Sequence, residues 1–172
     1  AGLVRQACST LIDRLSQPIT IEPMTKFPGV RDLRVNRQRM FEDLKRVKAW
    51  IEIDGTHNIG PGPRMKPQDQ AVGYELSRCM TCGCCLEACP QVGPRSDFMG
   101  AAPISQVRLF NIHPTGKMYA AERLDALMGS DGISGCGNAQ NCVAACPKDI
   151  PLTVSIADVE RQMTGRMFKK LL

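Results

Sequence analysis

The N-terminal part of the chain alternates apolar and polar residues, whereas most of the rest repeats apolar residues at helical spacing. Residues 18–23 alternate between two prolines, which predicts a strand, and residues 30–35 predict a second one. Two strands cannot bury a core by themselves. They therefore need partners from the rest of the chain or from sequence that it lacks.

Helices are expected over most of residues 36–172. The first should begin with Asn36 as its N-cap and end near Trp50. Its apolar face follows a helical period and consists of Met40, Phe41, Leu44, Val47 and Ile51. The other helices are expected at 68–78, from Pro103 to the stop at His113-Pro114, at 118–128 and at 151–172. Glycine and proline predict a loop at 54–68, and residues 91–102 should be irregular.

A tight group of cysteines interrupts the helical pattern. Cysteines stand at 79, 82, 85 and 89 and are followed by Pro90, which is the C-x2-C-x2-C-x3-C-P spacing of bacterial iron–sulfur runs. Three thiolates from one tight loop can bind one face of an iron–sulfur cubane, while the fourth cysteine, a helical turn on, points elsewhere. In proteins with two such clusters the fourth cysteine ligates the other cluster, so a second run is expected.

The second run lies at residues 136–147 and lacks one cysteine. Cys136, Cys142 and Cys146 repeat the spacing, and Ala139 stands where the second cysteine should be. If the two runs exchange their last cysteines, two sites result. Site one has four thiolates and suits a [4Fe–4S] cluster: Cys79, Cys82, Cys85 and Cys146. Site two has three: Cys89, Cys136 and Cys142. Because alanine cannot hold iron, site two predicts a [3Fe–4S] cluster, or a [4Fe–4S] cluster with a water-bound iron.

Zinc and disulfide bonds are the alternatives for this many cysteines. Zinc sites usually combine two separated C-x2-C pairs rather than tight triples followed by C-P. Disulfides are disfavoured because the pattern has a cofactor geometry and the chain carries no secretory signal.

Composition adds to this interpretation. Aromatic residues make up 5% of the 172 residues, so clusters that cross-link the chain would help to stabilise a core with few large rings. The net charge of +5 suits an anionic partner or a membrane surface, or is a solvated basic face, and it is not the signature of a nucleic-acid-binding protein. No apolar run reaches transmembrane length. The chain starts at Ala1 without a signal-like segment, which indicates processing or a fragment.

These residues resemble a known family, the iron–sulfur subunits of succinate dehydrogenase and fumarate reductase. The resemblance covers nearly the whole chain and is carried by residues 78–90, 105–116 and 141–148, together with 41–50 and 60–65. It is greatest to the bacterial type that works with menaquinone and a single dihaem cytochrome b anchor. It implies a mostly α fold, with an α-helical ferredoxin domain at 36–172 that carries two clusters. Residues 1–35 would be the small β remnant of an N-terminal [2Fe–2S] β-grasp domain.

The resemblance also implies the cofactors. The family carries a [2Fe–2S] cluster near the flavin, then a [4Fe–4S] cluster, then a [3Fe–4S] cluster near the quinone. It assigns the cysteines of site one to the [4Fe–4S] cluster and those of site two to the [3Fe–4S] cluster, in agreement with the spacing. Cys8 aligns with the isolated fourth ligand of the [2Fe–2S] site, whose other three ligands are missing from this sequence. Only the full-length protein would then hold that cluster.

Two features depart from the family pattern. Cys84 stands at a position that is not a ligand in the family, and only Cys85 keeps both the C-x2-C step and the x3 step to Cys89. Ubiquinone-type relatives have a histidine and tryptophans where this chain has Gly137 and residues 91–94. This argues against a quinone held beside site two by these residues, although Pro90 remains a candidate wall of the electron path.

The expected function is electron transfer, with no catalytic residue in the chain itself. The chain would take electrons from a flavoprotein (FAD) subunit that oxidises succinate. It would pass them to a membrane-anchor cytochrome b subunit and a quinone, menaquinone by the resemblance, as a peripheral protein at the cytoplasmic face of the bacterial cell membrane. With one thiolate fewer, site two is expected to have a higher reduction potential than an all-cysteine site.

Two alternative functions are considered. One is a catalytic cluster whose open iron acts as a Lewis acid, although no acid–base constellation surrounds the second run. The other is the iron–sulfur subunit of a different quinone-linked complex. Such subunits often keep all four cysteines in both runs, so Ala139 argues against this alternative.

Overall fold

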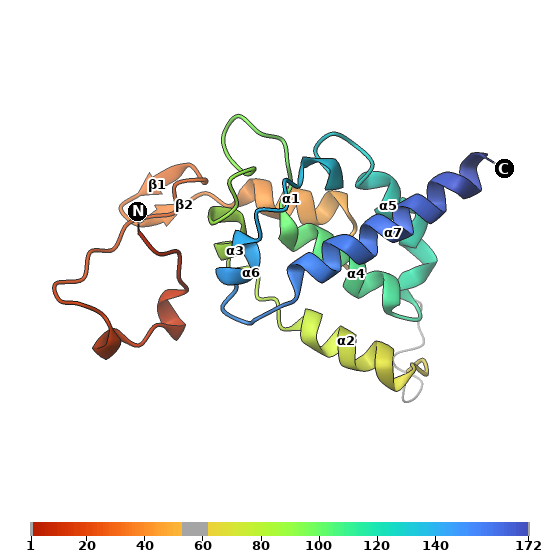
Figure 1. Ribbon diagram of the computed structural model, residues 1–172, viewed down its shortest axis with the longest axis horizontal. Coiled ribbons are helices and arrows are strands. Elements are labelled where there is room, and N and C mark those ends of the chain that lie inside the picture. Colours follow the sequence, from red (N-terminus) through yellow and green to blue (C-terminus); the bar gives the residue numbers. More distant parts are fainter. Residues whose placement is uncertain (1, 53–61, 172) are drawn as a thin grey trace.

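The computed structural model describes residues 2–52 and 62–171 (Figure 1). Most of the loop expected at 54–68 lies outside these residues, and its described part up to residue 66 is irregular. Within the described residues, no helix combines the length and the apolar character needed to cross a bilayer.

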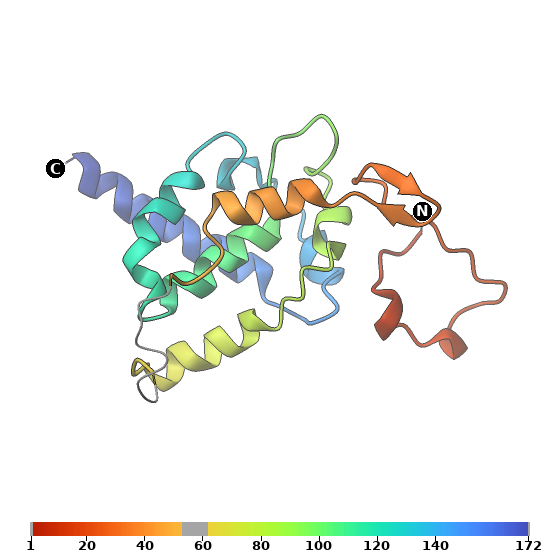
Figure 2. The same cartoon turned by 180° about the vertical axis from the view of Figure 1, so that it is seen from behind.

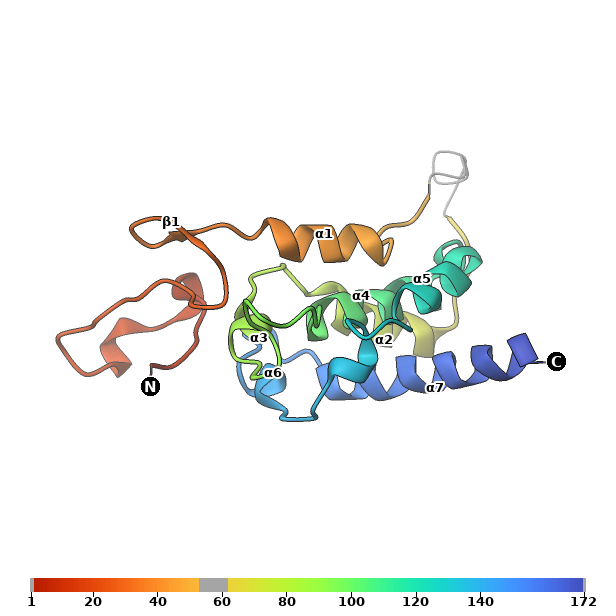
Figure 3. The same ribbon diagram turned by 90° about the horizontal axis from the view of Figure 1, so that it is seen from above.

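Helix α4 (Ala101–Ile112) is the central element of the helical body, and residues 101–107 are all buried. The helices that it contacts include α1 (Gln38–Arg46), α2 (Pro67–Ser77), α5 (Ala120–Ala126) and α7 (Leu152–Leu171). Figure 3 shows α1 and α7 on opposite sides of α4. The sequence predicts that this helix starts at Pro103, but it begins two residues earlier, at Ala101. This is possible because Pro103 lies in the first turn, where its missing N–H has no helical carbonyl to bind.

The helices expected at 68–78 and 151–172 are confirmed as α2 and α7. The helix expected at 118–128 is instead a 3-10 helix at Gly116–Tyr119 followed by α5. Two helices of four residues, α3 (Cys84–Glu87) and α6 (Asn141–Ala144), lie within the two cysteine runs and contact each other. Further 3-10 helices lie at Ala7–Ser9, Ile12–Arg14 and Ile133–Gly135.

Helix α1 is shorter than the sequence predicts. Asn36 supports its start, because its side-chain oxygen accepts a hydrogen bond from the N–H of Gln38 at 2.8 Å. The helix ends at Arg46, shortly before Lys48 adopts a left-handed φ of +48°. On the predicted apolar face Met40 is buried, but Phe41 is 49% exposed. Only part of that face therefore packs on the body.

The N-terminal residues contain little regular structure. The strand predicted at 18–23 is wrong: these residues are irregular, and no strand among the described residues lies alongside to bind their backbone. The strand predicted at 30–35 is a small antiparallel hairpin of β1 (Gly29–Arg31) and β2 (Arg34–Val35). Figures 1 and 2 show this segment beside the end of the body that carries α3 and α6.

Two groups of buried apolar residues form the core, and each includes cysteine side chains at its edge. The larger contains, among others, Met40, Val47, Leu86, Val107 and Val159, with Cys85, Cys89 and Cys136 packed against it. The smaller consists of Leu76, Ala101, Cys142, Ile150 and Leu152, with Cys79, Cys85 and Cys146 packed against it. The cysteine side chains of both runs thus pack in or against the core.

Candidate iron–sulfur sites

The two cysteine runs fold into the same loop-and-helix unit. In the first run Thr81 and Gly83 have left-handed φ angles of +50° and +87°. In the second run Asn138 and Gln140, at the same places in the spacing, have φ angles of +52° and +61°. Helix α3 follows the first loop and α6 follows the second. The internal repeat seen in the sequence is therefore also a repeat of backbone conformation.

Equivalent backbone hydrogen bonds close both units. The N–H of Cys89 donates to the carbonyl of Leu86 at 3.2 Å, and that of Cys146 donates to Val143 at 3.1 Å. The last cysteine of each run therefore has the same backbone hydrogen bond to the short helix that precedes it. Because α3 and α6 contact each other, each last cysteine can reach the loop of the other run.

Site one is a cavity with cysteines from both runs. Four cysteines line it: Cys79, Cys82, Cys85 and Cys146. Ala102, Ile150 and Leu152 are among the apolar residues that complete its wall. Burial raises the pKa of Cys85, and the neighbouring thiols, first that of Cys79, raise it further. Iron bound in this cavity would compensate the negative charge of the thiolates that ligate it.

Site two is a second cavity, lined by Cys89, Cys136 and Cys142 together with Ala139. Burial raises the pKa of Cys142, and the nearby thiols of Cys89 and Cys136 act in the same direction. Residues 137–141 of its wall are exposed. The corner of site two without a cysteine therefore lies at the surface of the described chain.

Adjacent residues at the start of α4 separate the two cavities. Ala101 lines site two and Ala102 lines site one. The preceding Gly100 has a φ of +83°, and a Cβ there would collide with the Leu86 side chain, so α4 begins directly against α3. No side chain caps this helix start. Its positive end therefore lies between two cavities suited to anionic groups.

Cys84 and Cys8 line neither cavity. Cys84 is 1% exposed, and burial, followed by the nearby Cys82, raises its pKa to about 12. Cys84 is thus a neutral thiol packed behind site one, while Cys85 faces the cavity. Cys8 lies exposed in the N-terminal segment.

The donor sets fit iron–sulfur clusters. All nine cysteines are free thiols, and seven of them, four and three, line the two cavities. In the described parts, 2–52 and 62–171, no three His, Cys, Asp or Glu side chains converge as they would around one metal ion. A zinc ion needs its sulfurs at about 2.3 Å from one centre. A cluster spreads several irons among its sulfurs, and tight triples of cysteine with one more from the other run suit a cluster better than a single zinc ion.

Two further side chains, for which the sequence pattern gives no signal, contact site one. Arg37 donates to the carbonyl oxygens of Thr81 and Cys82 at 3.1 and 3.5 Å. Burial raises the pKa of Cys79, and hydrogen bonds, one of them with the buried Gln106 side chain, oppose that rise. These contacts join segments far apart in the sequence, so local patterns gave no signal for them.

Comparisons with known proteins agree with this geometry. Residues 75–150 match the family described as the 4Fe-4S dicluster domain. The succinate dehydrogenase iron-sulfur subunit of Bacillus subtilis is 60% identical over 168 residues, which cover 98% of this chain and 66% of that protein. The fumarate reductase iron-sulfur subunit of Wolinella succinogenes is 34% identical over 162 residues, covering 92% of this chain and 68% of that protein.

A solved structure has the same fold. A chain of the Mycobacterium smegmatis Sdh1 complex in the apo form superimposes with a TM-score of 0.71 at 21% identity, covering 95% of this chain and 70% of that one. The present chain thus spans about two thirds of the length of the relatives that it matches. On these identities and coverages, the chain belongs to the family of succinate dehydrogenase and fumarate reductase iron–sulfur subunits.

Proposed function

We propose that this chain is the electron-transfer part of a succinate:quinone oxidoreductase. The observation that carries the proposal is the pair of cysteine-lined cavities on either side of the start of α4, where Ala101 lines one and Ala102 the other. Iron–sulfur clusters bound there would accept and release single electrons. The chain's own residues would hold the two groups side by side, and their burial and hydrogen bonding would set the potentials of the clusters.

Each site is assigned a cofactor by its thiol count. Site one would hold a [4Fe–4S] cluster through Cys79, Cys82, Cys85 and Cys146. Site two would hold a [3Fe–4S] cluster through Cys89, Cys136 and Cys142, because Ala139 supplies no ligand. Residues 36–172 would form the domain with these sites. Residues 1–35, with Cys8, would be the end of an upstream domain whose [2Fe–2S] cluster requires the full-length protein.

The proposed partners follow from the family. They are a flavoprotein (FAD) subunit, a membrane-anchor cytochrome b subunit and a quinone, most simply menaquinone, with the chain bound peripherally at the cytoplasmic face of the cell membrane. The exposed segment 137–141 supports an exit for electrons at site two, since it brings the site to the surface. The net charge of +5 suits a membrane surface or an anionic partner.

A catalytic cluster is less well supported. An open iron that acts as a Lewis acid needs an acid or a base beside it. The polar side chains among the described residues that line site two are uncharged: Gln91, Asn138, Gln140, Asn141 and Thr153. None of them can act as a general base near neutral pH, so electron transfer is favoured.

Iron and sulfide analysis combined with electron paramagnetic resonance (EPR) of the anaerobically purified protein tests the proposal. We expect about seven irons per chain, four from site one and three from site two. The oxidised protein should give a nearly isotropic three-iron signal without added iron. A single zinc ion per chain, or an EPR-silent oxidised protein with about eight irons, would contradict it.

A further inference from the structure

Two loops lead to residues that line site two, Phe98 and Cys136. The first, residues 90–100, follows Cys89 and carries Phe98, which lines the cavity and is 4% exposed. The second, residues 127–135, leads directly into Cys136. The N–H of Met99 donates to the carbonyl of Asp131 at 3.0 Å, which joins the two loops. Neither loop is part of a long helix, so contacts with the body must determine its position.

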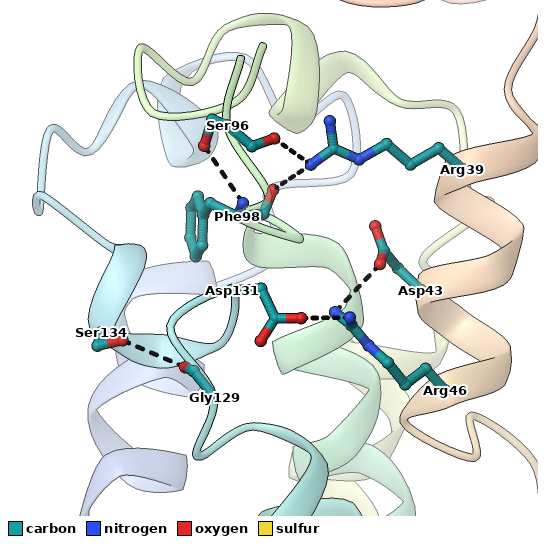
Figure 4. A network of polar contacts seen from close by, with 8 residues as sticks. All are labelled: Arg39, Asp43, Arg46, Ser96, Phe98, Gly129, Asp131 and Ser134. Carbon is teal, nitrogen blue, oxygen red and sulfur yellow. Dashed lines mark hydrogen bonds and ion pairs between the residues drawn. The ribbon is translucent and has the colours of Figure 1, made fainter. Parts of the chain in front are cut away.

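Arg39 of α1 holds the first loop. Its guanidinium donates to the carbonyl oxygen of Gly93 at 3.1 Å. It also donates to the carbonyl oxygens of Ser96 at 2.5 Å and Phe98 at 3.3 Å (Figure 4). The N–H of Phe98 in turn donates to the Ser96 hydroxyl at 3.2 Å. One side chain thus gathers three carbonyls of the loop and fixes the backbone of the residue whose ring lines site two.

Arg46 of the same helix holds the second loop. It forms an ion pair with Asp131, and a second one with Asp43 of its own helix at 3.2 Å (Figure 4). Arg39, Asp43 and Arg46 recur at helical spacing, so they lie on one face of α1. That face therefore binds both loops at once.

The position of the Phe98 ring and the position of the backbone just before Cys136 depend on each other. A Cβ at Gly135 would lie 2.6 Å from Cδ2 and 2.9 Å from Cγ of Phe98, so the ring rests directly on the backbone of residue 135. Cys136 is the next residue. A shift of either loop would therefore move the apolar wall and a proposed cluster ligand together.

We propose that Arg39 and Arg46 are positioning residues for site two: they hold Phe98 over the cavity as a cover against water and fix the approach to Cys136. The inference rests on the proposed function, since it requires a cluster at site two. Solvent exposure is one of the properties that set a cluster's potential and its accessibility to reagents. The reduced cluster carries one more negative charge than the oxidised one, so water that enters would favour reduction.

Two variants test this with different side effects. Arg46→Ala removes the ion pair. Gly129→Ala weakens the same pair without changing the charge, because a methyl group there would collide with the Asp131 carboxylate and displace it. Arg46→Lys keeps a cation that can reach Asp131. The matched control for the glycine variant is Gly165→Ala in α7, where an added Cβ meets nothing within 4 Å.

The purified cluster-loaded protein is treated with an iron chelator and a mild oxidant. Site two is followed by EPR of the oxidised samples, and site one by EPR of the same samples after reduction. In Arg46→Ala and Gly129→Ala we expect the three-iron signal to decay several-fold faster than in the wild type, while the site-one signal decays at its normal rate. The potential of site two should rise in Gly129→Ala. Arg46→Lys and Gly165→Ala should behave like the wild type.

The outcomes separate the two proposals. The positioning role alone would be overturned if the wild type gives the three-iron signal and both test variants show the same decay rate and the same potential at site two. Equal acceleration at both sites would also overturn it, because the effect would then be general destabilisation. Absence of the three-iron signal from the wild type itself would overturn the proposed function as well.

Discussion

The Glu87 carboxylate, which lies between two cysteine positions of the first run, binds Thr25 from the N-terminal segment. It accepts hydrogen bonds from the backbone N–H of Thr25 at 2.8 Å and from its hydroxyl at 2.7 Å, and one from the N–H of Lys26 at 2.9 Å. The adjacent side chains of Met24 and Phe27 pack against Gly83 in the loop of site one. One carboxylate therefore fastens the N-terminal segment over this site.

Replacing Glu87 with alanine should loosen this segment. Three hydrogen bonds to a charged acceptor are lost, and because the contact is exposed we expect a cost of roughly 1–3 kcal/mol in local stability. The measurement is amide hydrogen exchange at Thr25 and Lys26, which should accelerate by about fivefold or more. Glu160→Ala, an exposed position on α7, is the control. Unchanged exchange in Glu87→Ala would show that other contacts hold the segment.

The two neighbouring cysteines of α3 should respond differently to substitution with serine. Cys85→Ser removes a proposed ligand that lines site one, so the four-iron EPR signal of the reduced protein should be lost or strongly altered. Cys84→Ser changes a buried neutral thiol behind the cavity, so the cluster should be retained. Loss of the signal in the Cys84 variant alone would contradict the assignment.

Arg123 is 1% exposed and joins three parts of the helical body. It donates to the carbonyl oxygens of Lys48 at 2.9 Å, Trp50 at 2.8 Å and Gly116 at 2.5 Å. Arg123→Met would leave these acceptors without their donor and should cost about 3 kcal/mol. In a chain of this size the melting temperature should fall by roughly 6–12 °C. Arg161→Met, at a side chain that is 81% exposed, should change it little.

Asp125 should stabilise the end of α7 at all pH values near neutral. Hydrogen bonds from Arg166 and then Lys170 hold its pKa below its ordinary value. A carboxylate with a lowered folded-state pKa contributes fully above its unfolded value of about 3.9, and loses that contribution as the pH falls toward the folded value. The side chain is 38% exposed, so the effect should stay below about 1 kcal/mol.

The measurement is hydrogen exchange in the last turns of α7, compared between the wild type and Asp125→Asn. The difference in protection should be constant between pH 5 and pH 8, after correction for the intrinsic exchange rate. A difference that disappears as the pH rises from 5 to 8 would show that another group controls this helix end.

The sequence predicts the site better than it predicts the N-terminal fold. The cysteine spacing specifies a loop and a short helix, and both runs adopt them, because the glycine at 83 and the polar residues at 138 and 140 accept left-handed backbone. The strand at 18–23 fails because alternation alone provides no neighbouring strand. The contacts of Arg39, Arg123 and Glu87 could not be predicted, since each joins segments that only the tertiary fold brings together.

Ala139→Cys should convert site two into a four-thiolate site. Ala139 lines the cavity at the place of the missing second cysteine, and the backbone around it repeats that of the first run. A fourth thiolate would bind an additional iron and add negative charge, which disfavours the reduced cluster and should lower the potential of site two. Redox titration followed by EPR should show loss of the three-iron signal of the oxidised protein and a new four-iron signal on reduction. Ala139→Ser, which adds a hydroxyl group of similar size but a poorer iron ligand, is the matched control and should keep the three-iron signal. If Ala139→Cys also kept that signal at an unchanged potential, the open corner of site two would not face residue 139, and the assignment of its three ligands would need revision.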